Sequence, residues 1–507
     1  MNDCVFFLGQ PKVETLEPVN DQSCVIGQDT QISWKFSGID KPRVKWLFNN
    51  KPLPTSDRFK IADTEDGTST LSIRQAERAD QGIYTAMATN SAGEAEARTT
   101  LSIIIKPVIT DNLDDSLEIV KAKTMTLRIT AIGTPKPGIV WMKGNNKIKP
   151  IDRIHETAQN HDDDYIYTLE IVNLQPEDEG EYSATISNIG GSLQSNKCKI
   201  TVSINIPVNA TWAQNGVTIA GGNGYRAATN QLHFPFGLFV DDDQTVVIAD
   251  FGNHCIMQWK NGDITNGQVV AGGKGRGDGL HELDRPTDVL IDKETNSLII
   301  CDHGNQRVVR WSRHSGTTQG EILIENIRCW GLAMDKQRYL YVSDVGKDEV
   351  RRYRLGEKNG TLVAGGNGQG DGLNQLNVPV YLFVDRDHSV YVSDNENHRV
   401  MKWNKGATEG IVVAGGLGRW SALTHLYYPN GIFVDTLGTL YVVDSLNNRV
   451  MRCTQGGKKQ ATIIVGGNGE GGGVNQFNVP RGLSFDRHGN LYVADTGNNR
   501  VQRFSIE

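Results

Sequence analysis

Apolar and polar residues alternate in short runs along the first two hundred positions of the chain. Segments 30–36, 43–48, 69–74 and 82–89 each place their apolar side chains on one face, with turn residues between them. Such alternation is typical of β-strands that are buried on one side. The pattern begins again after residue 106, so we expect two successive β-sandwiches, over residues 11–105 and 107–204.

Each predicted sandwich carries a Trp and a Tyr at immunoglobulin-like spacing. Trp46 and Trp141 stand where the buried core Trp of that fold lies. Tyr84 and Tyr182 each follow an Asp-x-Gly-x sequence, which is the spacing of a tyrosine corner. On these residues, and on the hairpin sequences after each Tyr, both segments resemble I-set immunoglobulin domains of the muscle proteins titin and twitchin.

The core cysteines typical of that family are missing. Trp34 and Ala86 occupy the two positions in the first sandwich, and Ile129 and Ala184 occupy them in the second. A large apolar residue facing a small one can replace the packing of a disulfide. The seven cysteines of the chain are scattered, without a CxxC pair, so we expect neither a disulfide framework nor a zinc site.

Cysteine usage and hydrophobicity also bear on location. The apolar run near the start is too short for the core of a signal peptide, and no later run approaches the length of a membrane span. Together with the missing core cysteines, these features predict a cytoplasmic protein.

The last three hundred residues contain six copies of one short sequence motif, at a period of about fifty residues. Each copy reads as four strands, with an Asp at the end of the second strand. Four strands cannot bury both faces alone, so neighbouring copies must pack face to face, and six arranged radially close a ring. The repeated residues are Asp250, Asp302, Asp344, Asp394, Asp444 and Asp495.

The final copy contains its first three strands and no fourth. Segment 216–224 has the Gly-Gly signature of a fourth strand but no first three strands before it. We expect this segment to lie beside Val501–Phe504, so that the end of the chain completes the ring rather than being a truncation.

An Arg follows the repeated Asp by five residues in most copies and is a candidate to pair with it. Copies one and three have Cys255 and Glu349 instead. Recurrence in most copies indicates a structural role, because a catalytic residue would more often occur once. The arginines are Arg307, Arg399, Arg449 and Arg500.

The phrase D-x-x-N-x-R-V, with its flanking LYVAD and VPxGLxVD sequences, resembles the NHL repeat. The resemblance covers about residues 212–507 and implies a six-bladed NHL β-propeller. The expected fold is therefore all-β: two immunoglobulin-like sandwiches followed by a propeller that an N-terminal strand closes.

The resemblance implies several possible activities. NHL propellers of tripartite-motif ubiquitin ligases recognise protein or RNA but rely on a RING finger, which the cysteines here cannot form. A related peptide-amidating lyase needs a histidine-bound metal. Two of the four candidate histidines, His254 and His398, stand at a repeat position that other copies fill with Gln or Asn, which favours a turn role. The other candidates are His303 and His388.

A ligand face is predicted where the copies differ. The residue after each Pro, or its equivalent, varies from copy to copy, and two copies also replace the Gly that follows it. Aromatic residues with one Arg are typical of a protein-binding hot spot; a role in lining the channel is the alternative. The positions are Phe236, Thr287, Asp288, Trp330, Val380, Tyr381, Asn430 and Arg481.

Charge separates the remaining functions. The net charge is −7; residues 1–205 hold 22 basic and 28 acidic residues, and residues 206–507 hold 30 and 31. Neither part has the basic excess typical of nucleic-acid binding. We expect a non-enzymatic scaffold that binds protein partners, with no cofactor, no metal and no membrane contact. The alternatives are substrate recognition for a ubiquitin ligase, RNA binding and, least favoured, a metal-dependent lyase.

Overall fold

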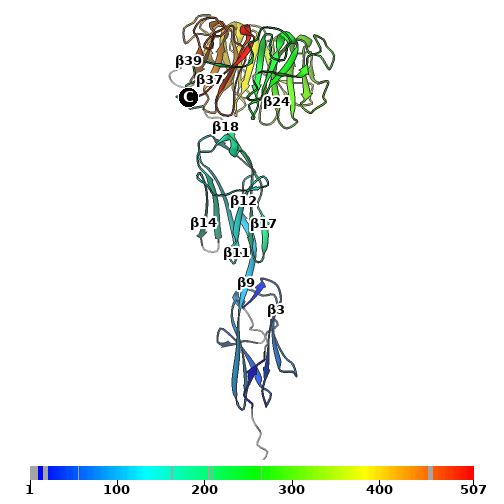
Figure 1. Ribbon diagram of the computed structural model, residues 1–507, viewed down its shortest axis with the longest axis vertical. Coiled ribbons are helices and arrows are strands. Elements are labelled where there is room, and N and C mark those ends of the chain that lie inside the picture. The colour runs from blue at the N-terminus through cyan, green and yellow to red at the C-terminus, as the bar shows by residue number, and fades with distance from the viewer. Residues whose placement is uncertain are drawn as a thin grey trace, which may run out of the picture. The chain divides into compact units, whose positions relative to one another are not determined.

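The computed structural model describes residues 9–14, 21–54, 56–161, 164–203, 206–207, 209–263, 265–454 and 461–507. The chain divides into two compact units, Met1–Val202 and Ser203–Glu507 (Figure 1). Throughout the described ranges, every regular element is a β-strand or a single turn of 3₁₀ helix. The protein is therefore all-β.

The first unit contains two β-sandwiches. The first sandwich places a four-stranded sheet, in the order β1-β3-β7-β6, against the strands β2, β9, β8, β4 and β5. Its elements are β1 (Lys12–Val13), β2 (Gln22–Val25), β3 (Thr30–Ser37), β4 (Arg43–Phe48), β5 (Lys51–Pro52), β6 (Phe59–Asp63), β7 (Thr68–Ile73), η1 (Arg78–Asp80), β8 (Gly82–Asn90) and β9 (Gly93–Asp111).

The second sandwich repeats this arrangement. Strands β14, β15 and β11 join the far part of β9, and the facing sheet runs β10-β18-β16-β12-β13, with β17 beside β16. Its elements are β10 (Ser116–Val120), β11 (Met125–Thr134), β12 (Gly138–Lys143), β13 (Asn146–Lys147), β14 (Ile154–His161), β15 (Asp164–Ile171), η2 (Pro176–Asp178), β16 (Gly180–Asn188), β17 (Gly191–Gln194) and β18 (Cys198–Ser203).

Apolar packing fills the place of the missing core disulfides. In the first sandwich Trp34, Trp46 and Ala86 are all buried in one cluster. In the second, Ile129, Trp141 and Ala184 lie together in the same way. Burial of each large apolar side chain stabilises a domain by about 1.5–3 kcal/mol, which offsets much of what a disulfide provides.

Both tyrosine corners are formed. The Tyr84 hydroxyl donates to Asp80 O at 2.8 Å, and the Tyr182 hydroxyl donates to Asp178 O at 2.7 Å. Each acceptor lies in the 3₁₀ turn that precedes the strand of the Tyr. Burial is the main reason why the pKa of both phenols is raised, so the hydroxyls remain protonated donors.

Strand β9 belongs to both sandwiches. It pairs with β8 through Gly93–Leu101 and with β11 through Ile105–Asp111. The strand is continuous through residues 103–110, where the first sandwich gives way to the second. Pro107 lies at a shift of register between Ile105 and Val108, where its lack of an N–H removes no ladder hydrogen bond.

The second unit consists of six four-stranded antiparallel sheets. The first strands are β20 (Pro235–Val240), β24 (Pro286–Asp292), β28 (Cys329–Met334), β32 (Pro379–Val384), β36 (Pro429–Val434) and β40 (Leu483–Phe485). The second strands are β21 (Val246–Asp250), β25 (Ser297–Asp302), β29 (Tyr339–Asp344), β33 (Val390–Asp394), β37 (Leu440–Asp444) and β41 (Leu491–Asp495).

The outer half of each sheet follows the same order. The third strands are β22 (Cys255–Trp259), β26 (Arg307–Ser312), β30 (Glu349–Arg354), β34 (Arg399–Trp403), β38 (Arg449–Cys453) and β42 (Arg500–Phe504). The fourth strands are β23 (Gln268–Gly272), β27 (Glu321–Glu325), β31 (Thr361–Gly365), β35 (Ile411–Gly415), β39 (Ala461–Gly466) and β19 (Val217–Gly221).

The first strands contact one another in a closed order. The contacts run from β20 through β24, β28, β32, β36 and β40, and β40 contacts β20 again. Five sheets carry a 3₁₀ turn after the second strand: η3 (Phe251–Asn253), η4 (His303–Asn305), η5 (Asn395–Asn397), η6 (Ser445–Asn447) and η7 (Thr496–Asn498). The third copy, which has Glu349 in place of the repeated Arg, also folds into a full four-stranded sheet.

One sheet combines distant parts of the chain. Strand β19 pairs antiparallel with β42, with Val217 opposite Arg503 and Gly221 opposite Arg500. Trp212, just before β19, is buried, and its Nε1 donates to Gly489 O at 3.0 Å. The missing fourth strand of the last copy is therefore supplied from before the first copy, as we expected.

A disulfide joins Cys301 on β25 to Cys329 on β28. We expected no disulfide framework, and among the described cysteines this bridge is the one exception. Cys301 directly precedes the repeated Asp302, whereas Cys329 stands where other copies have the Pro of the first strand. Because the two cysteines occupy different positions of the repeat, their spacing in the sequence did not predict that they pair. Cys24, Cys198, Cys255 and Cys453 are free and buried.

Candidate functional site

The repeated Asp and Arg form buried pairs in four of the sheets. In the second sheet, Arg307 Nε donates to Asp302 Oδ2 at 2.7 Å. The other guanidinium N–H groups of Arg307 donate to the carbonyls of Asp278, Gly279 and Glu282, in the loop before the first strand. Equivalent pairs join Asp394 to Arg399, Asp444 to Arg449 and Asp495 to Arg500. Each pair thus fixes a loop to the end of a sheet.

Asp250 lacks this arginine because Cys255 replaces it. Its carboxylate accepts hydrogen bonds from His233 N and from Asn253 Nδ2, both at 2.8 Å. Burial raises the pKa of Asp250 to about 7. Burial also raises the pKa of Asp302, Asp394, Asp444 and Asp495, and there the arginine opposes the shift.

His254 and His398 act as turn residues that connect neighbouring sheets. Nδ1 of His398 accepts the backbone N–H of Tyr428 at 3.3 Å, and Nδ1 of His254 accepts that of Arg285 at 3.1 Å. In other copies the side chains of Asn448 and Asn499 accept the corresponding N–H, at 2.8 and 2.9 Å. An accepting Nδ1 carries no proton, so the imidazole is neutral.

We expect His398→Asn to remove part of the acid sensitivity of the second unit. Burial lowers the pKa of His398 below its ordinary value. The hydrogen bond therefore stabilises the fold above the ordinary pKa of His and is lost as the pH falls through the lowered value. Thermal unfolding measured from about pH 7.5 to about pH 5 should show a smaller loss of melting temperature for the variant than for the wild type.

The reciprocal change, Asn448→His, is the control and should increase the loss in acid. Equal slopes for His398→Asn and the wild type would contradict the role assigned to His398. Other titrating groups, such as Asp250, are the same in all three proteins and do not affect the comparison.

Glycine allows the first strands to approach closely at four of the six junctions. A Cβ at Gly237 would lie 2.1 Å from Asp288 Oδ1, and a Cβ at Gly482 would lie 2.3 Å from Phe236 O. Gly331 and Gly431 are equally crowded by the neighbouring strand. Such distances exclude any side chain, so close approach requires Gly.

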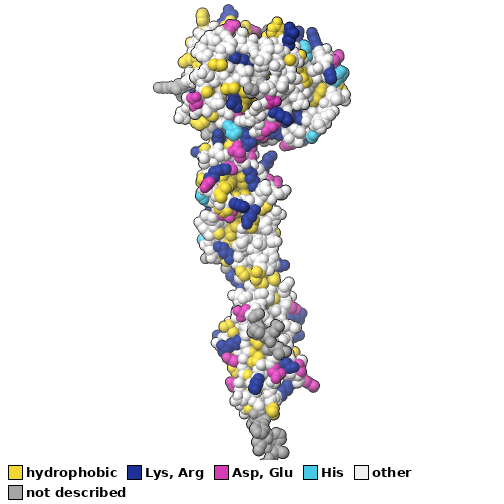
Figure 2. Space-filling view, viewed as in Figure 1, with side chains coloured by type: hydrophobic (Ala, Val, Ile, Leu, Met, Phe, Trp, Pro, Cys, Tyr) yellow, Lys and Arg dark blue, Asp and Glu magenta, His cyan; other side chains and the backbone are white. Residues whose placement is uncertain are grey.

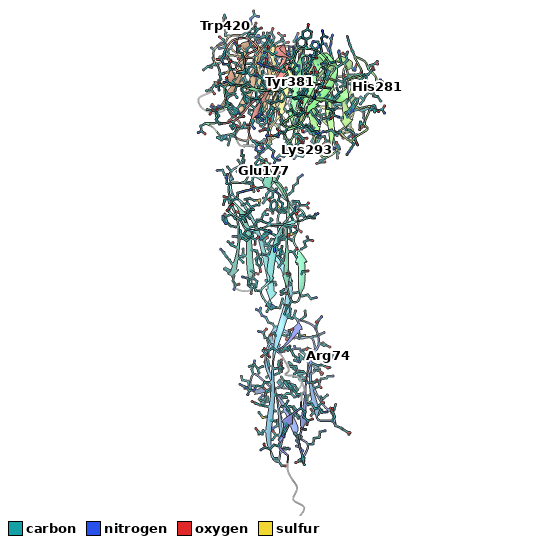
Figure 3. The ribbon with its side chains drawn as sticks, in the orientation of Figure 1. Arg74, Glu177, His281, Lys293, Tyr381 and Trp420 are labelled. Atoms are coloured by element: carbon teal, nitrogen blue, oxygen red, sulfur yellow. A yellow bond between two sulfur atoms is a disulfide. The ribbon has the colours of Figure 1, made fainter. Side chains whose placement is uncertain are left out.

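Asp288 and Tyr381 take the place of this glycine in the other two copies, and both are buried. Asp288 Oδ2 accepts Leu332 N of the next sheet at 2.9 Å. Burial raises the pKa of Asp288 to about 7 and that of Tyr381 well above its usual range. Figure 3 marks Tyr381 among the strands of this unit. These two side chains fill space between the inner strands.

Beside them lies an aromatic–arginine cluster, formed by Phe236, Phe251, His303, Trp330 and Arg481. The guanidinium of Arg481 lies over the ring of Phe236, 4.5 Å from its centroid, and 6.0 Å from that of Trp330. Phe236 stacks on Phe251 at 4.3 Å and on Trp330 at 5.8 Å. His303 meets the Trp330 ring edge-on at 5.2 Å.

The predicted ligand face is only partly accessible. Phe236, Thr287, Asp288, Val380, Tyr381 and Asn430 are buried, whereas Trp330 and Arg481 are partly exposed. Six of the eight residues therefore lie in the packed interior, because the first strands bring them there. Sequence reasoning missed Phe251, which follows the repeated Asp250 and could have been found by comparing that position between copies.

The four histidines considered as metal ligands serve other contacts. Besides His254 and His398, Nδ1 of His303 lies 2.8 Å from Cys329 O, and Nδ1 of His388 lies 3.2 Å from Asp335 Oδ2. Among the residues that the structure describes, no three His, Cys, Asp or Glu side chains gather as metal ligands.

Comparison with known proteins gives family matches in the first unit and in one segment of the second. Residues 13–103 and 107–204 match the Immunoglobulin I-set domain, and residues 477–504 match the NHL repeat. The muscle M-line assembly protein unc-89 of Caenorhabditis elegans is 29% identical over 218 residues, 41% of this chain and 3% of that protein. Hemicentin-1 of Homo sapiens is 30% identical over 183 residues, 36% of this chain and 3% of that protein.

Among solved structures, the titin Ig tandem domains A164-A165 are 25% identical, cover 39% of this chain and 99% of their own, and give a TM-score of 0.26. Another match, with 27% identity, 38% and 62% coverage and a TM-score of 0.30, is to extracellular domains 3–5 of Drosophila OTK. The chain thus spans a small part of the curated relatives that it matches. Because they include muscle and extracellular proteins, the cytoplasmic location stays a prediction.

No helix within the described ranges has the length and apolar character needed to cross a membrane. The matched residues account for the paired tyrosine corners and buried tryptophans of the first unit. The chain therefore carries tandem I-set immunoglobulin domains similar to those of titin-like muscle proteins, together with an NHL repeat at residues 477–504.

Proposed function

We propose that the protein is a non-enzymatic scaffold that binds protein partners through its I-set domains and through a six-bladed NHL β-propeller. The domains would run over residues 11–105, 107–204 and 212–507. The closed order of contacts among the six first strands and the recurring Asp–Arg pairs support the propeller. The I-set match and the M-line and hemicentin relatives support protein binding.

The observation that carries a binding role for the propeller is the aromatic–arginine cluster. Trp and Arg are enriched among residues that dominate binding energy in protein interfaces. Here the indole N–H of Trp330 and the Nε–H of Arg481 are both buried without a hydrogen-bond partner. Both atoms are shielded from solvent, so a partner would bind through the partly exposed remainder of these two side chains.

Affinity purification of the intact chain should recover protein partners that Trp330→Ala with Arg481→Ala fails to recover. Tyr381 stays unchanged in this test because it is buried, and its truncation would disturb the fold. Trp420, which is highly exposed and lies outside the cluster, provides the control substitution Trp420→Ala. Figure 3 marks Trp420 on the surface of this unit.

The purified material also separates the alternatives. Recovery of ligase subunits would favour substrate recognition for a ubiquitin ligase, and nuclease-sensitive recovery of RNA would favour RNA binding. Lys and Arg side chains lie intermixed with Asp and Glu on the visible face of this unit (Figure 2), which is unlike a basic face for RNA. An unchanged set of partners in the double variant would contradict the role of the cluster.

A further inference from the structure

Arg481 is held in an unusual electrostatic environment. Within the described residues, its contacts are the rings of Phe236 and Trp330 and a long contact of 3.5 Å with Asn430 Oδ1. Burial lowers its pKa, and Tyr381 is the one group that opposes this change. A guanidinium that is removed from water without a carboxylate beside it is costly and gains from an anionic ligand.

The surroundings of Arg481 add positive potential. The guanidinium of Arg285 lies 6.0 Å from the centroid of Phe251, within the same cluster. The pKa of His303 is lowered, mainly by burial and then by Arg328 and Arg285. The acidic group near His303, Asp284, already pairs with Arg276, whose Nε lies 3.0 Å from Asp284 Oδ1.

We propose that the aromatic–arginine cluster binds a carboxylate of an acidic segment in a protein partner, with the guanidinium of Arg481 as the donor. This inference rests on the proposed function and specifies its chemistry. The rings of Phe236 and Trp330 would contact the aliphatic part of a Glu or Asp side chain, and Arg285 and Arg328 would face neighbouring acidic residues of the segment. Arginine suits this role because its N–H groups match a carboxylate in a plane.

A carboxylate fits better than a phosphate chain. Residues 206–507 carry nearly balanced charge, with 30 basic and 31 acidic residues, so a long polyanion would meet repulsion beyond the cluster. One desolvated arginine between two aromatic rings can accommodate a single anionic group. RNA is therefore an outcome to be tested rather than part of the proposal.

Binding of an acetylated, amidated hexaglutamate peptide to the intact chain tests the proposal by titration calorimetry, with hexaglutamine as the uncharged probe. We expect binding of hexaglutamate alone, weakened by added salt. Arg481→Gln should weaken it about tenfold or more, which is the size of one charge-assisted hydrogen bond. The matched control is Arg352→Gln, which removes an equal charge from an arginine that lies 4.8 Å from the ring centroid of Tyr339 and outside the cluster.

Arg285→Gln with Arg328→Gln provides a second test that does not depend on a buried side chain, because both arginines are exposed. This variant should weaken binding several-fold through the lost potential. The proposal would be overturned if the wild type failed to bind hexaglutamate, if Arg481→Gln bound as the wild type does, or if oligouridylate bound more tightly. A further outcome distinguishes the two proposals. If Trp330→Ala with Arg481→Ala lost the natural partners but the wild type did not bind hexaglutamate, the proposed scaffold function would stand and the proposed carboxylate ligand would be refuted.

Discussion

Deletion of residues 212–222 is expected to destabilise the second unit more than any single substitution. The deletion removes β19, so that β42 loses its partner strand and becomes an open edge. It also removes buried Trp212, whose ring lies 5.9 Å from Tyr441 and 6.0 Å from Phe485. Truncation of a buried Trp alone typically costs about 3–5 kcal/mol.

Differential scanning calorimetry of the intact chain measures this effect, with the transitions of the I-set domains as an internal reference. Deletion of residues 498–507 removes the whole of the opposite strand, β42, and should lower the melting temperature by a similar amount. Trp212→Ala separates the contribution of the side chain from that of the strand. If the shortened chain melted at the temperature of the intact one, closure by β19 would be refuted.

Replacement of Asp394 by Ala is expected to lower the free energy of unfolding by about 3–5 kcal/mol. Both Asp394 and Arg399 are buried, and their Nε–Oδ2 distance is 2.6 Å. Without the carboxylate, Arg399 stays buried with an uncompensated charge. The N–H of Asn377 loses its acceptor, and the side-chain amide of Asn397 loses one of its two acceptors. Denaturant unfolding of the wild type and of the variant measures the difference.

The control for this experiment is the ion pair of Arg310 with Glu321. Its side chains are 31% and 61% exposed, so Glu321→Ala should cost at most about 1 kcal/mol. If Asp394→Ala proved as mild as Glu321→Ala, the repeated pairs would not be the structural elements inferred from their burial.

Local periodicity made much of the strand pattern predictable. Segment 43–48 of the sequence coincides with β4, and segment 82–89 lies within β8. The pairing of β19 with β42 was predictable because one copy lacked a strand that another segment had in excess. In contrast, the continuity of β9 was not predictable, because a Pro usually interrupts a strand and sequence does not show a shift of register.

The sequence predicted which positions belong to the candidate site but not which of their side chains are exposed. Variation between copies identified Trp330 and Arg481, which are partly exposed. The same variation identified Asp288 and Tyr381, which instead fill space where four other copies need glycine. Exposure depends on how closely neighbouring sheets approach, and a single sequence does not contain that distance.

The pairing of β19 with β42 has a consequence for biosynthesis. A ribosome produces β19 well before β42, so the sheet that contains both strands cannot form until most of the unit has emerged. In the meantime β19 has no partner, and the apolar faces of the neighbouring sheets stay open. The nascent chain would therefore depend on chaperones over this interval, and its vulnerability would end abruptly when β42 is released.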